Sequence, residues 1–253
     1  MPLLSIQKVT KKFPREDGKP TVALRDVYLD IEEKEFICIV GSSGCGKTTL
    51  LRIIAGLETI TEGTILLNGV PVSGTDTDRG MVFQEYSLFP WKSVIDNIAF
   101  GLEMRGIPKA ERREMAEKYL EIIHLEQFRD SFPHELSGGM RQRVAIARAL
   151  ANQPKVLLMD EPFGALDAQT RNMMQRELLE IWKETQKTII FVTHSVDEAV
   201  FLADKIVILT PRPGKIEEVI PITLPRLRDR TAPEFAEVRK YILQKMEESA
   251  QTR

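Results

Sequence analysis

Residues 41–48 carry the clearest chemical signal in the sequence. Their order, Gly-Ser-Ser-Gly-Cys-Gly-Lys-Thr, matches the pattern G-x-x-x-x-G-K-[ST] and lies between a buried apolar run and an apolar helix. Glycines let successive backbone N–H groups point at one anion, and the helix that follows adds its positive N-terminal end. We expect Lys47 to pair with the β- and γ-phosphates of a nucleoside triphosphate and Thr48 to ligate Mg²⁺. The alternative is a glycine-rich turn with a chance Lys-Thr pair.

Two acidic residues, Asp160 and Glu161, follow the apolar run 156–159. The carboxyl end of a buried strand is where ligands bind in open α/β sheets. One carboxylate there can hold Mg²⁺, directly or through a water, and a second can polarise the attacking water as a general base. We expect Asp160 in the first role and Glu161 in the second. The alternative is a solvated turn that happens to carry two acids.

A cysteine, Cys45, lies inside the glycine-rich loop. The loop N–H groups and the Lys47 ammonium are expected to favour its thiolate, which predicts alkylation that slows when a triphosphate is bound. The alternative is that Cys45 is an inert small filler. The only other cysteine is Cys38, in a predicted core strand, so no disulfide is expected and a reducing compartment fits.

Four continuous apolar runs predict strands that are buried on both faces, as in a mainly parallel α/β sheet. They are residues 36–40, 156–159, 189–192 and 206–209. Alternating residues at 4–6 and 27–31 predict half-buried strands near the N-terminus.

Helices are expected between the strands. Ser195 with Glu198 predicts a capping box, and Thr231 with Glu234 predicts another at the start of a C-terminal helix. From about residue 86 to residue 150 no buried strand run occurs, which indicates a helical lobe inserted into the sheet domain. Inward faces are predicted from helical spacing at Ala116, Tyr119, Leu120, Ile123, Met174, Leu178, Ile181, Trp182, Phe235, Val238, Ile242 and Met246.

Composition sets the broad class. The 253 residues are 43% hydrophobic and 28% charged, with a formal net charge of −2. This mix excludes disordered, collagen-like and disulfide-scaffold classes, and it shows no overall basic bias toward nucleic acid. The apolar runs are far shorter than the roughly 20 residues that span a bilayer, and residues 1–10 do not look like a secretory signal. A membrane role would therefore need a partner.

Residues 136–143, Leu-Ser-Gly-Gly-Met-Arg-Gln-Arg, complete a set of motifs that resembles the ATP-binding cassette (ABC) ATPases over nearly the full chain. The family often has Gln where this chain has Met140, at a position that tolerates variation. The resemblance implies an α/β fold of the P-loop NTPase (RecA-like) type, with a mainly parallel sheet core, an N-terminal antiparallel β portion and an inserted α-helical subdomain. It implies one ABC ATPase domain over residues 1–253, with its catalytic core at 1–85 and 151–253 and its helical subdomain at about 86–150.

The resemblance also implies the role of each site residue. Glu161, His194 and Lys47 would be catalytic, and Thr48, Gln84 and Asp160 would hold Mg²⁺. The ATP-binding residues would be Phe13, Gly41, Ser42, Ser43, Gly44, Cys45, Gly46, Lys47, Thr48, Thr49, Gln84, Asp160, Ser137, Gly138, Gly139 and Asp167. Phe13 would stack on adenine, although a core role is open, and His194 would contact the γ-phosphate and the attacking water, although a lone histidine can be structural.

Ser137 is expected to be a helix N-cap, and Gly138 and Gly139 allow close approach to the backbone, which makes a second anion-binding helix end. One nucleotide cannot easily satisfy both anion sites from within one chain. In the family, two chains pair head to tail, so that each ATP lies between the phosphate loop of one and the signature motif of the other. The alternative is that the Ser-Gly-Gly sequence only caps a helix.

Residues 86–91, Tyr-Ser-Leu-Phe-Pro-Trp, with Val94, Ile95 and Ile98, lie where the family forms a groove, between Gln84 and Gly101. That groove receives a coupling helix from a membrane permease. The alternative is that these residues are core of the helical lobe.

Residues 88–91, 136–143 and 210–216 resemble the branch that imports nitrate, sulfonate, taurine or bicarbonate, although 210–216 can also be read as a rigid turn. The resemblance implies an ATP-hydrolysing subunit on the cytoplasmic face of the membrane. Its partners would be a second ATPase subunit, permease subunits and, indirectly, an extracytoplasmic substrate-binding protein, with no nucleic acid. An exporter ATPase is the nearest alternative, and a non-transport ABC ATPase is a further one.

Overall fold

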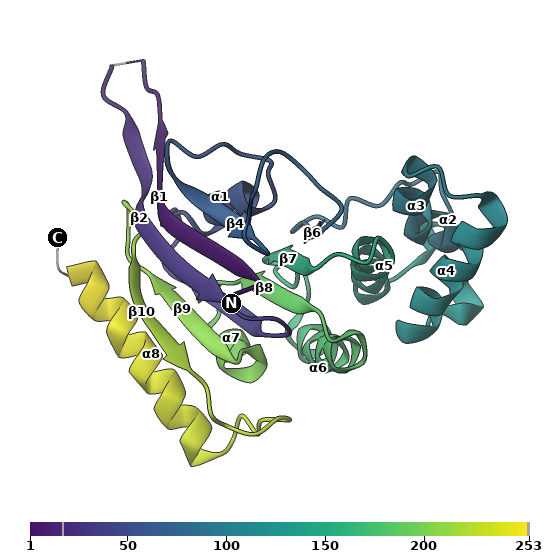
Figure 1. Ribbon diagram of the computed structural model, residues 1–253. Helices are drawn as coiled ribbons and strands as arrows, with labels where there is room; N and C mark the ends of the chain where they lie inside the picture. The colour runs from purple at the N-terminus through teal and green to yellow at the C-terminus, as the bar shows by residue number, and fades with distance from the viewer. Residues whose placement is uncertain (17, 252–253) are drawn as a thin grey trace. The chain divides into compact units, whose positions relative to one another are not determined.

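The computed structural model describes residues 1–16 and 18–251. It divides into two compact units, the first formed by Met1–Asp76 with Thr188–Arg253 and the second by Thr77–Lys187 (Figure 1).

The first unit contains an antiparallel sheet in the order β2-β1-β4-β5. Its strands are β1 (Leu4–Phe13), β2 (Thr21–Ile31), β4 (Glu62–Leu67) and β5 (Val70–Pro71). Val27, Leu29 and Ile31 of β2 point into the core and the residues between them are exposed. The alternation predicted for residues 27–31 is therefore confirmed, whereas at residues 4–6 it is wrong, because Ser5 is buried together with Leu4 and Ile6.

The first unit also contains neighbouring strands in the order β10-β9-β3-β8. They are β3 (Phe36–Val40), β8 (Thr188–Val192), β9 (Lys205–Leu209) and β10 (Ile216–Pro221). Strand β3 is parallel to β8 and β9, while β10 is antiparallel to β9. Every residue of β3 and β8 is buried, as continuous apolar runs predict.

The register of these parallel strands brings three loops to one edge. Ile39 of β3 is paired with Val192 of β8, and Val40 of β3 with Ile208 of β9. The chain therefore leaves β3, β8 and β9 at the same level. The unit's helices are α1 (Lys47–Ile54), α7 (Val196–Leu202) and α8 (Pro233–Gln251), of which α8 packs on α7 and β9.

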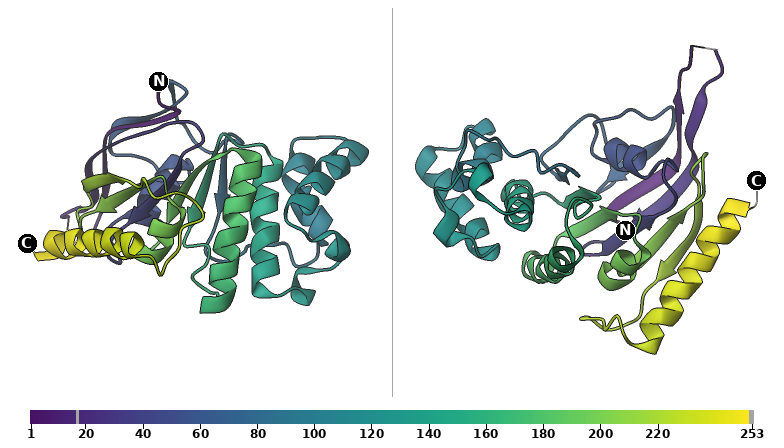
Figure 2. Two further views of the ribbon diagram at one scale, coloured as in Figure 1. Left: turned by 90° about the horizontal axis from the view of Figure 1, so that it is seen from below. Right: turned by 180° about the vertical axis from the view of Figure 1, so that it is seen from behind.

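The second unit combines two parallel strands with helices. The strands are β6 (Arg79–Val82) and β7 (Val156–Asp160), and the helices are α2 (Val94–Ile98), α3 (Phe100–Met104), α4 (Lys109–Ile122), α5 (Gly138–Ala151) and α6 (Ala168–Thr185), with short 3₁₀ turns at Glu126–Phe128 and Pro133–Glu135. Helices α5 and α6 run side by side in Figure 2. The boundaries at about residues 86 and 150 stay a prediction.

Two predicted caps differ from expectation in part. The Ser195 Oγ accepts from the Glu198 N–H at 3.3 Å, as predicted, but the Glu198 carboxylate accepts from the Thr193 hydroxyl and the Ser195 N–H donates to the same hydroxyl. At the start of α8, Thr231 donates its hydroxyl to Asp229 at 2.7 Å. In both places a nearer polar side chain competes for the hydrogen bond that a capping box would make.

Among the residues that the structure describes, no helix combines the length and apolarity required to cross a bilayer.

Candidate functional site

The glycine-rich loop connects the end of β3 to the start of α1. Gly46, the N-cap of α1, has φ 107°, and a Cβ atom there would lie 2.7 Å from the Leu24 side chain. Only glycine combines that conformation with that contact. Because Gly46 has no side chain, it leaves the first N–H groups of α1 to an external acceptor, which suits a phosphate.

The Lys47 ammonium lies over the loop that precedes it. The residue is only 6% exposed, and its Nζ donates to the backbone oxygens of Gly41 at 2.8 Å and Ser42 at 3.2 Å. These bonds hold the positive charge at the mouth of the loop, where exposed Ser42, Ser43 and Gly44 form the rim. Thr48 and Thr49 follow half-buried in the first turn of α1.

Cys45 contradicts the expectation of a reactive thiolate. The residue is 1% exposed, and its Sγ would lie 2.7 Å from a Cβ at Gly41. Burial raises the pKa of Cys45, and this effect exceeds the opposing effects of the Lys47 charge and the backbone hydrogen bonds. The alternative holds: Cys45 fills space beneath the loop, because burial disfavours the charged thiolate more than the loop and Lys47 favour it.

Thiol reagents at neutral pH are therefore expected to label neither Cys38 nor Cys45 in the folded protein, with or without ATP, because both are buried and burial raises the pKa of each. A mass spectrum after timed alkylation measures this, and a guanidinium-unfolded sample, in which both thiols react, is the control. Rapid labelling of Cys45 that ATP prevents would contradict the structure.

The turn between β9 and β10 supports the loop, a role that the sequence did not reveal. Thr210 closes the turn through its hydroxyl, which donates to Pro213 O at 3.0 Å, as expected for a rigid turn. Gly214 lies so near the loop that a Cβ there would be 2.1 Å from Cys45 O, and Arg212 donates to Gly44 O at 3.3 Å. In the sequence, the only indication of this supporting role is a glycine next to a basic residue shortly after the core strand β9.

His194 directly follows Thr193 after β8, and its side chain is exposed. The shared level of β3 and β8 places it at the strand edge from which the glycine-rich loop departs. An exposed imidazole at this edge can reach a ligand of the loop. Its assignment to the γ-phosphate stays a prediction.

Phe13 ends β1 and is half-buried. One side of its ring is occupied by the Lys11 ammonium, 4.7 Å from the ring centroid, which also pairs with Glu58 at 2.7 Å. A cation on one face draws electron density from the ring. Stacking of adenine on the ring stays a prediction.

In the second unit, the two predicted carboxylates lie at the end of β7. Asp160 is 8% exposed and Glu161 is half-buried. Glu161 has φ 44°, in the left-handed region, and its carbonyl accepts from the Gly164 N–H at 3.0 Å. Such a conformation in a non-glycine residue costs on the order of 1 kcal/mol and is typical of functional sites.

Gln84 lies at the same edge as these carboxylates. Val82 of β6 is paired with Met159 of β7, so the two strands end together. A Cβ at Gly164 would lie 3.5 Å from the Gln84 Nε2, which places the amide beside the turn after Glu161. The structure thus gathers three predicted site residues of this unit.

The signature residues begin α5 as predicted. The Ser137 Oγ accepts from the Met140 N–H at 3.3 Å, and Ser137 itself is exposed. A Cβ at Gly138 would lie 3.1 Å from the Tyr86 hydroxyl, and one at Gly139 3.2 Å from Thr170. Both glycines therefore have a packing reason within this chain, in addition to leaving the helix end open.

Asp167 is the N-cap of α6, accepting from the N–H groups of Gln169 and Thr170 at 3.0 Å each. Hydrogen bonds from Thr170, foremost from its backbone, lower the pKa of Asp167. Its local role is to cap this helix. An ATP-binding role stays a prediction.

Helix α5 is tied to the residues after Gln84 by arginines that the sequence argument did not single out. Arg148 donates to Ser87 O at 2.6 Å and Tyr86 O at 3.3 Å, and Arg141 lies 5.3 Å from the Tyr86 ring centroid. A movement of residues 86–87 would therefore also shift α5, the helix that begins with the signature residues. In the sequence, only the spacing of basic residues along this helix could have indicated these contacts.

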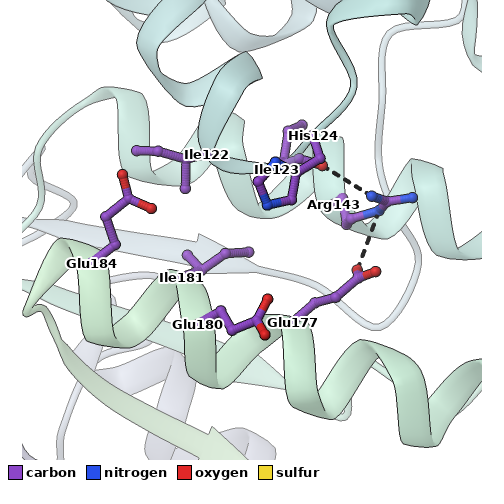
Figure 3. A pocket seen from close by; sticks show the side chains of 8 residues that line it. All are labelled: Ile122, Ile123, His124, Arg143, Glu177, Glu180, Ile181 and Glu184. Carbon is purple, nitrogen blue, oxygen red and sulfur yellow. Dashed lines mark hydrogen bonds and ion pairs between the residues drawn. The ribbon is translucent and has the colours of Figure 1, made fainter.

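Arg143 of α5 lines a small pocket, which Figure 3 shows. It donates to Ile123 O at 3.0 Å and pairs with Glu177 of α6 at 3.3 Å. Burial raises the pKa of Glu177, opposed by the charge of Arg143. The two contacts of Arg143 therefore hold α5 in place against its neighbours.

Only part of the stretch predicted to form a permease groove lies at the surface, and its role as a groove stays a prediction. Val94, Ile95 and Ile98 are at most 1% exposed, so for them the core alternative is correct. Trp91, by contrast, is 71% exposed, with its ring 5.6 Å from that of Phe89. The buried side chain of Asn97 fixes this loop through bonds to the backbone of residues 89, 92 and 93.

Comparison with known proteins gives the family. The ABC transporter family matches residues 24–164. The chain is 57% identical over 240 residues to an uncharacterized ABC transporter ATP-binding protein of Methanocaldococcus jannaschii, covering 95% of this chain and 90% of that one. It is 52% identical to the nitrate import ATP-binding protein NrtD of a Synechocystis species, covering 88% and 83%. It is 49% identical to the taurine import ATP-binding protein TauB of Roseobacter denitrificans, covering 85% and 80%.

Solved structures agree with these relatives. A dimeric ATP-binding cassette in a post-hydrolysis state, bound to ADP and Pi, matches with a TM-score of 0.74 at 33% identity, covering 89% of this chain and 99% of that one. The protein cbiO1 of Clostridium perfringens, part of the ABC transporter complex cbiONQ, matches with a TM-score of 0.78 at 27% identity, covering 96% and 93%. The α/β fold of the P-loop NTPase class predicted from the sequence is confirmed, and the chain belongs to the ABC transporter family as an ATP-binding cassette.

Proposed function

We propose that this chain hydrolyses ATP to drive an importer of a small solute, and that two copies work head to tail. The observation that carries the proposal is the pair of glycine-rich helix ends, α1 after Gly46 and α5 after Ser137, which lie in different compact units. Each end offers backbone N–H groups to an anion. A triphosphate held between an α1 end and the α5 end of a second copy would use both.

The chemistry follows from the residues at each strand edge. Lys47 stabilises the β- and γ-phosphates, Glu161 accepts a proton from the attacking water, and His194 holds that water and the γ-phosphate. The hydrogen bonds of Lys47 to the loop and the left-handed backbone conformation of Glu161 support these roles.

The donor set also fits Mg²⁺. Thr48, Gln84 and Asp160 offer a hydroxyl, an amide and a carboxylate, which are the hard oxygen donors that Mg²⁺ prefers. When bound, Mg²⁺ would neutralise the charge that develops on the transferred phosphoryl group. The chain's own residues orient the nucleotide.

Import is favoured over export because relatives at 49–52% identity are named for nitrate and taurine import. We place the chain on the cytoplasmic face of the membrane, held there by permease subunits and served indirectly by an extracytoplasmic substrate-binding protein. Exposed Trp91 on its rigid loop supports a docking surface for the permease.

Trp91→Ala is expected to weaken binding to the permease about 30-fold or more, as for a central aromatic contact, while the ATPase activity of the isolated cassette stays unchanged. Co-purification of the permease from solubilised membranes measures this. Met173→Ala, which removes another exposed side chain of the same unit, is the matched control. Full permease recovery with Trp91→Ala, or failure of the wild-type chain to retain any permease, would contradict the proposal.

A further inference from the structure

The backbone around His194 is closed by a chain of hydrogen bonds that link Thr193, Ser195 and Glu198. The Thr193 hydroxyl donates to the Glu198 Oε2 at 2.5 Å, and the Ser195 N–H donates to the same hydroxyl oxygen at 3.0 Å. The Glu198 N–H in turn donates to the Ser195 Oγ at 3.3 Å. The residues on both sides of His194 are therefore held by one another.

The two side chains that make these hydrogen bonds are buried, and each hydrogen bond has one direction. Thr193 is 1% exposed and Glu198 is 7% exposed. The Thr193 hydroxyl donates its single proton to the carboxylate oxygen of Glu198, which leaves a lone pair on the hydroxyl oxygen for the Ser195 N–H. The Thr193 N–H donates to Ile39 O of β3 at 3.2 Å, which fixes the same residue to the strand that precedes the phosphate loop.

The far end of α7 is also anchored, so the helix cannot simply slide. Arg228 donates to Val200 O and Ala203 O at 2.7 Å each, and Arg226 donates to Leu202 O at 2.6 Å. Burial, with the nearby charge of Arg226, lowers the pKa of Arg228 to about 10, so it keeps its charge at neutral pH. A loss of the Thr193–Glu198 bond must then be absorbed in the short segment that contains His194.

We propose that Thr193 and Glu198 are positioning residues, which fix the backbone of His194 and so hold its imidazole ready for the nucleotide. This inference rests on the proposed role of His194 in hydrolysis. Neither side chain needs to touch ATP, because both act through the peptide units that flank the histidine. A misplacement of a reacting group by about 1 Å can cost up to about 10²-fold in rate.

The full chain with Thr193→Val tests the proposal, because valine keeps the branched shape and loses the hydroxyl. We expect its ATPase kcat to fall about tenfold, with the KM for ATP within about twofold of wild type, and Thr193→Ser to restore the rate. Asp197→Asn is the matched control. It removes a carboxylate from the same helical turn, but this carboxylate pairs with Arg239 and not with Thr193. This control should hydrolyse ATP at the wild-type rate.

A spectroscopic measurement separates positioning from general damage. The chain has three histidines, so only three imidazole Cε1–H signals are expected in an NMR spectrum and each can be assigned. In Thr193→Val the His194 signal should broaden or split, while those of His124 and His134 in the other unit stay in place. Glu198→Gln, which weakens the hold on the hydroxyl, should produce the same change and keeps the test decisive if Thr193→Val does not fold. An unchanged His194 signal would overturn the proposal.

A double variant distinguishes failure of this inference from failure of the proposed function. If Thr193 acts through His194, Thr193→Val adds no further loss of kcat in a His194→Ala background. An equal loss in both backgrounds would overturn the inference and leave the catalytic role of His194 intact. Full activity of His194→Ala alone would instead overturn that catalytic role, and the NMR signals would then decide the positioning claim.

Discussion

Glu161→Gln is expected to lower the ATPase kcat by about 10²–10⁴-fold while ATP still binds. Glutamine matches the size of glutamate and can occupy the same turn after β7, where Gly164 N–H closes onto the Glu161 carbonyl. It cannot accept the proton of the attacking water. With hydrolysis blocked, the ATP-bound pair should accumulate, because the bound triphosphate continues to bridge the two helix ends.

Phosphate release, ATP binding and molar mass by light scattering measure this outcome on one sample. Glu180→Gln, at an exposed position of α6 in the same unit, is the matched control and should hydrolyse ATP normally. Turnover near the wild-type rate in Glu161→Gln would remove Glu161 as the general base. Loss of ATP binding would show instead that the carboxylate is needed to form the site.

Ser137→Arg is expected to abolish dimerisation and lower hydrolysis by at least about 10²-fold, with ATP binding by the single chain largely kept. Ser137 is exposed at the first turn of α5, so a long cationic side chain there would stand where the nucleotide of the second copy must approach. Binding by a single chain uses α1 and Lys47, in the other compact unit.

The effect of losing the Ser137 helix cap must be distinguished from the steric effect of the arginine side chain. Ser137→Ala removes the bond from the Met140 N–H, which costs about 1 kcal/mol, but adds no bulk. It should lower the melting temperature by about 2–4 °C and keep measurable hydrolysis. If Ser137→Ala and Ser137→Arg were equally inactive with equal melting temperatures, steric exclusion of a second copy would be the wrong explanation.

The sequence predicted the elements whose pattern is local. The fully apolar runs became β3, β7, β8 and β9, and Ser137 became an N-cap. The phosphate loop was also recognisable, because its glycines are needed for backbone reasons that hold in any sequence context.

What the sequence missed depends on contacts between distant segments. Strand β6 is short, β4 mixes exposed and buried residues, and β10 has no buried residue, so only their neighbours in the sheet define them. Burial of Cys45 depends on Gly41 and on the distant turn at Gly214. Val94, Ile95 and Ile98 could not be told from a docking surface, because an apolar helix face has the same pattern whether a partner or the chain's own core covers it.

The contacts made by arginines were the largest group of features that could not be predicted from the sequence. Arg148 and Arg228 donate to backbone carbonyls, and such bonds leave no complementary charge in the sequence to reveal them. The site was therefore predictable where phosphate chemistry dictates residue types, and unpredictable where a long side chain reaches a carbonyl far along the chain.

The proposed hydrolysis needs two copies of this chain to close over each ATP. The most direct test is the ATPase rate per chain measured across a wide dilution series, with molar mass followed by light scattering in the same buffer. We expect the rate per chain to fall on dilution as the population shifts from twice the chain mass to the single chain mass. A constant rate per chain in samples that remain at the single chain mass throughout would contradict it.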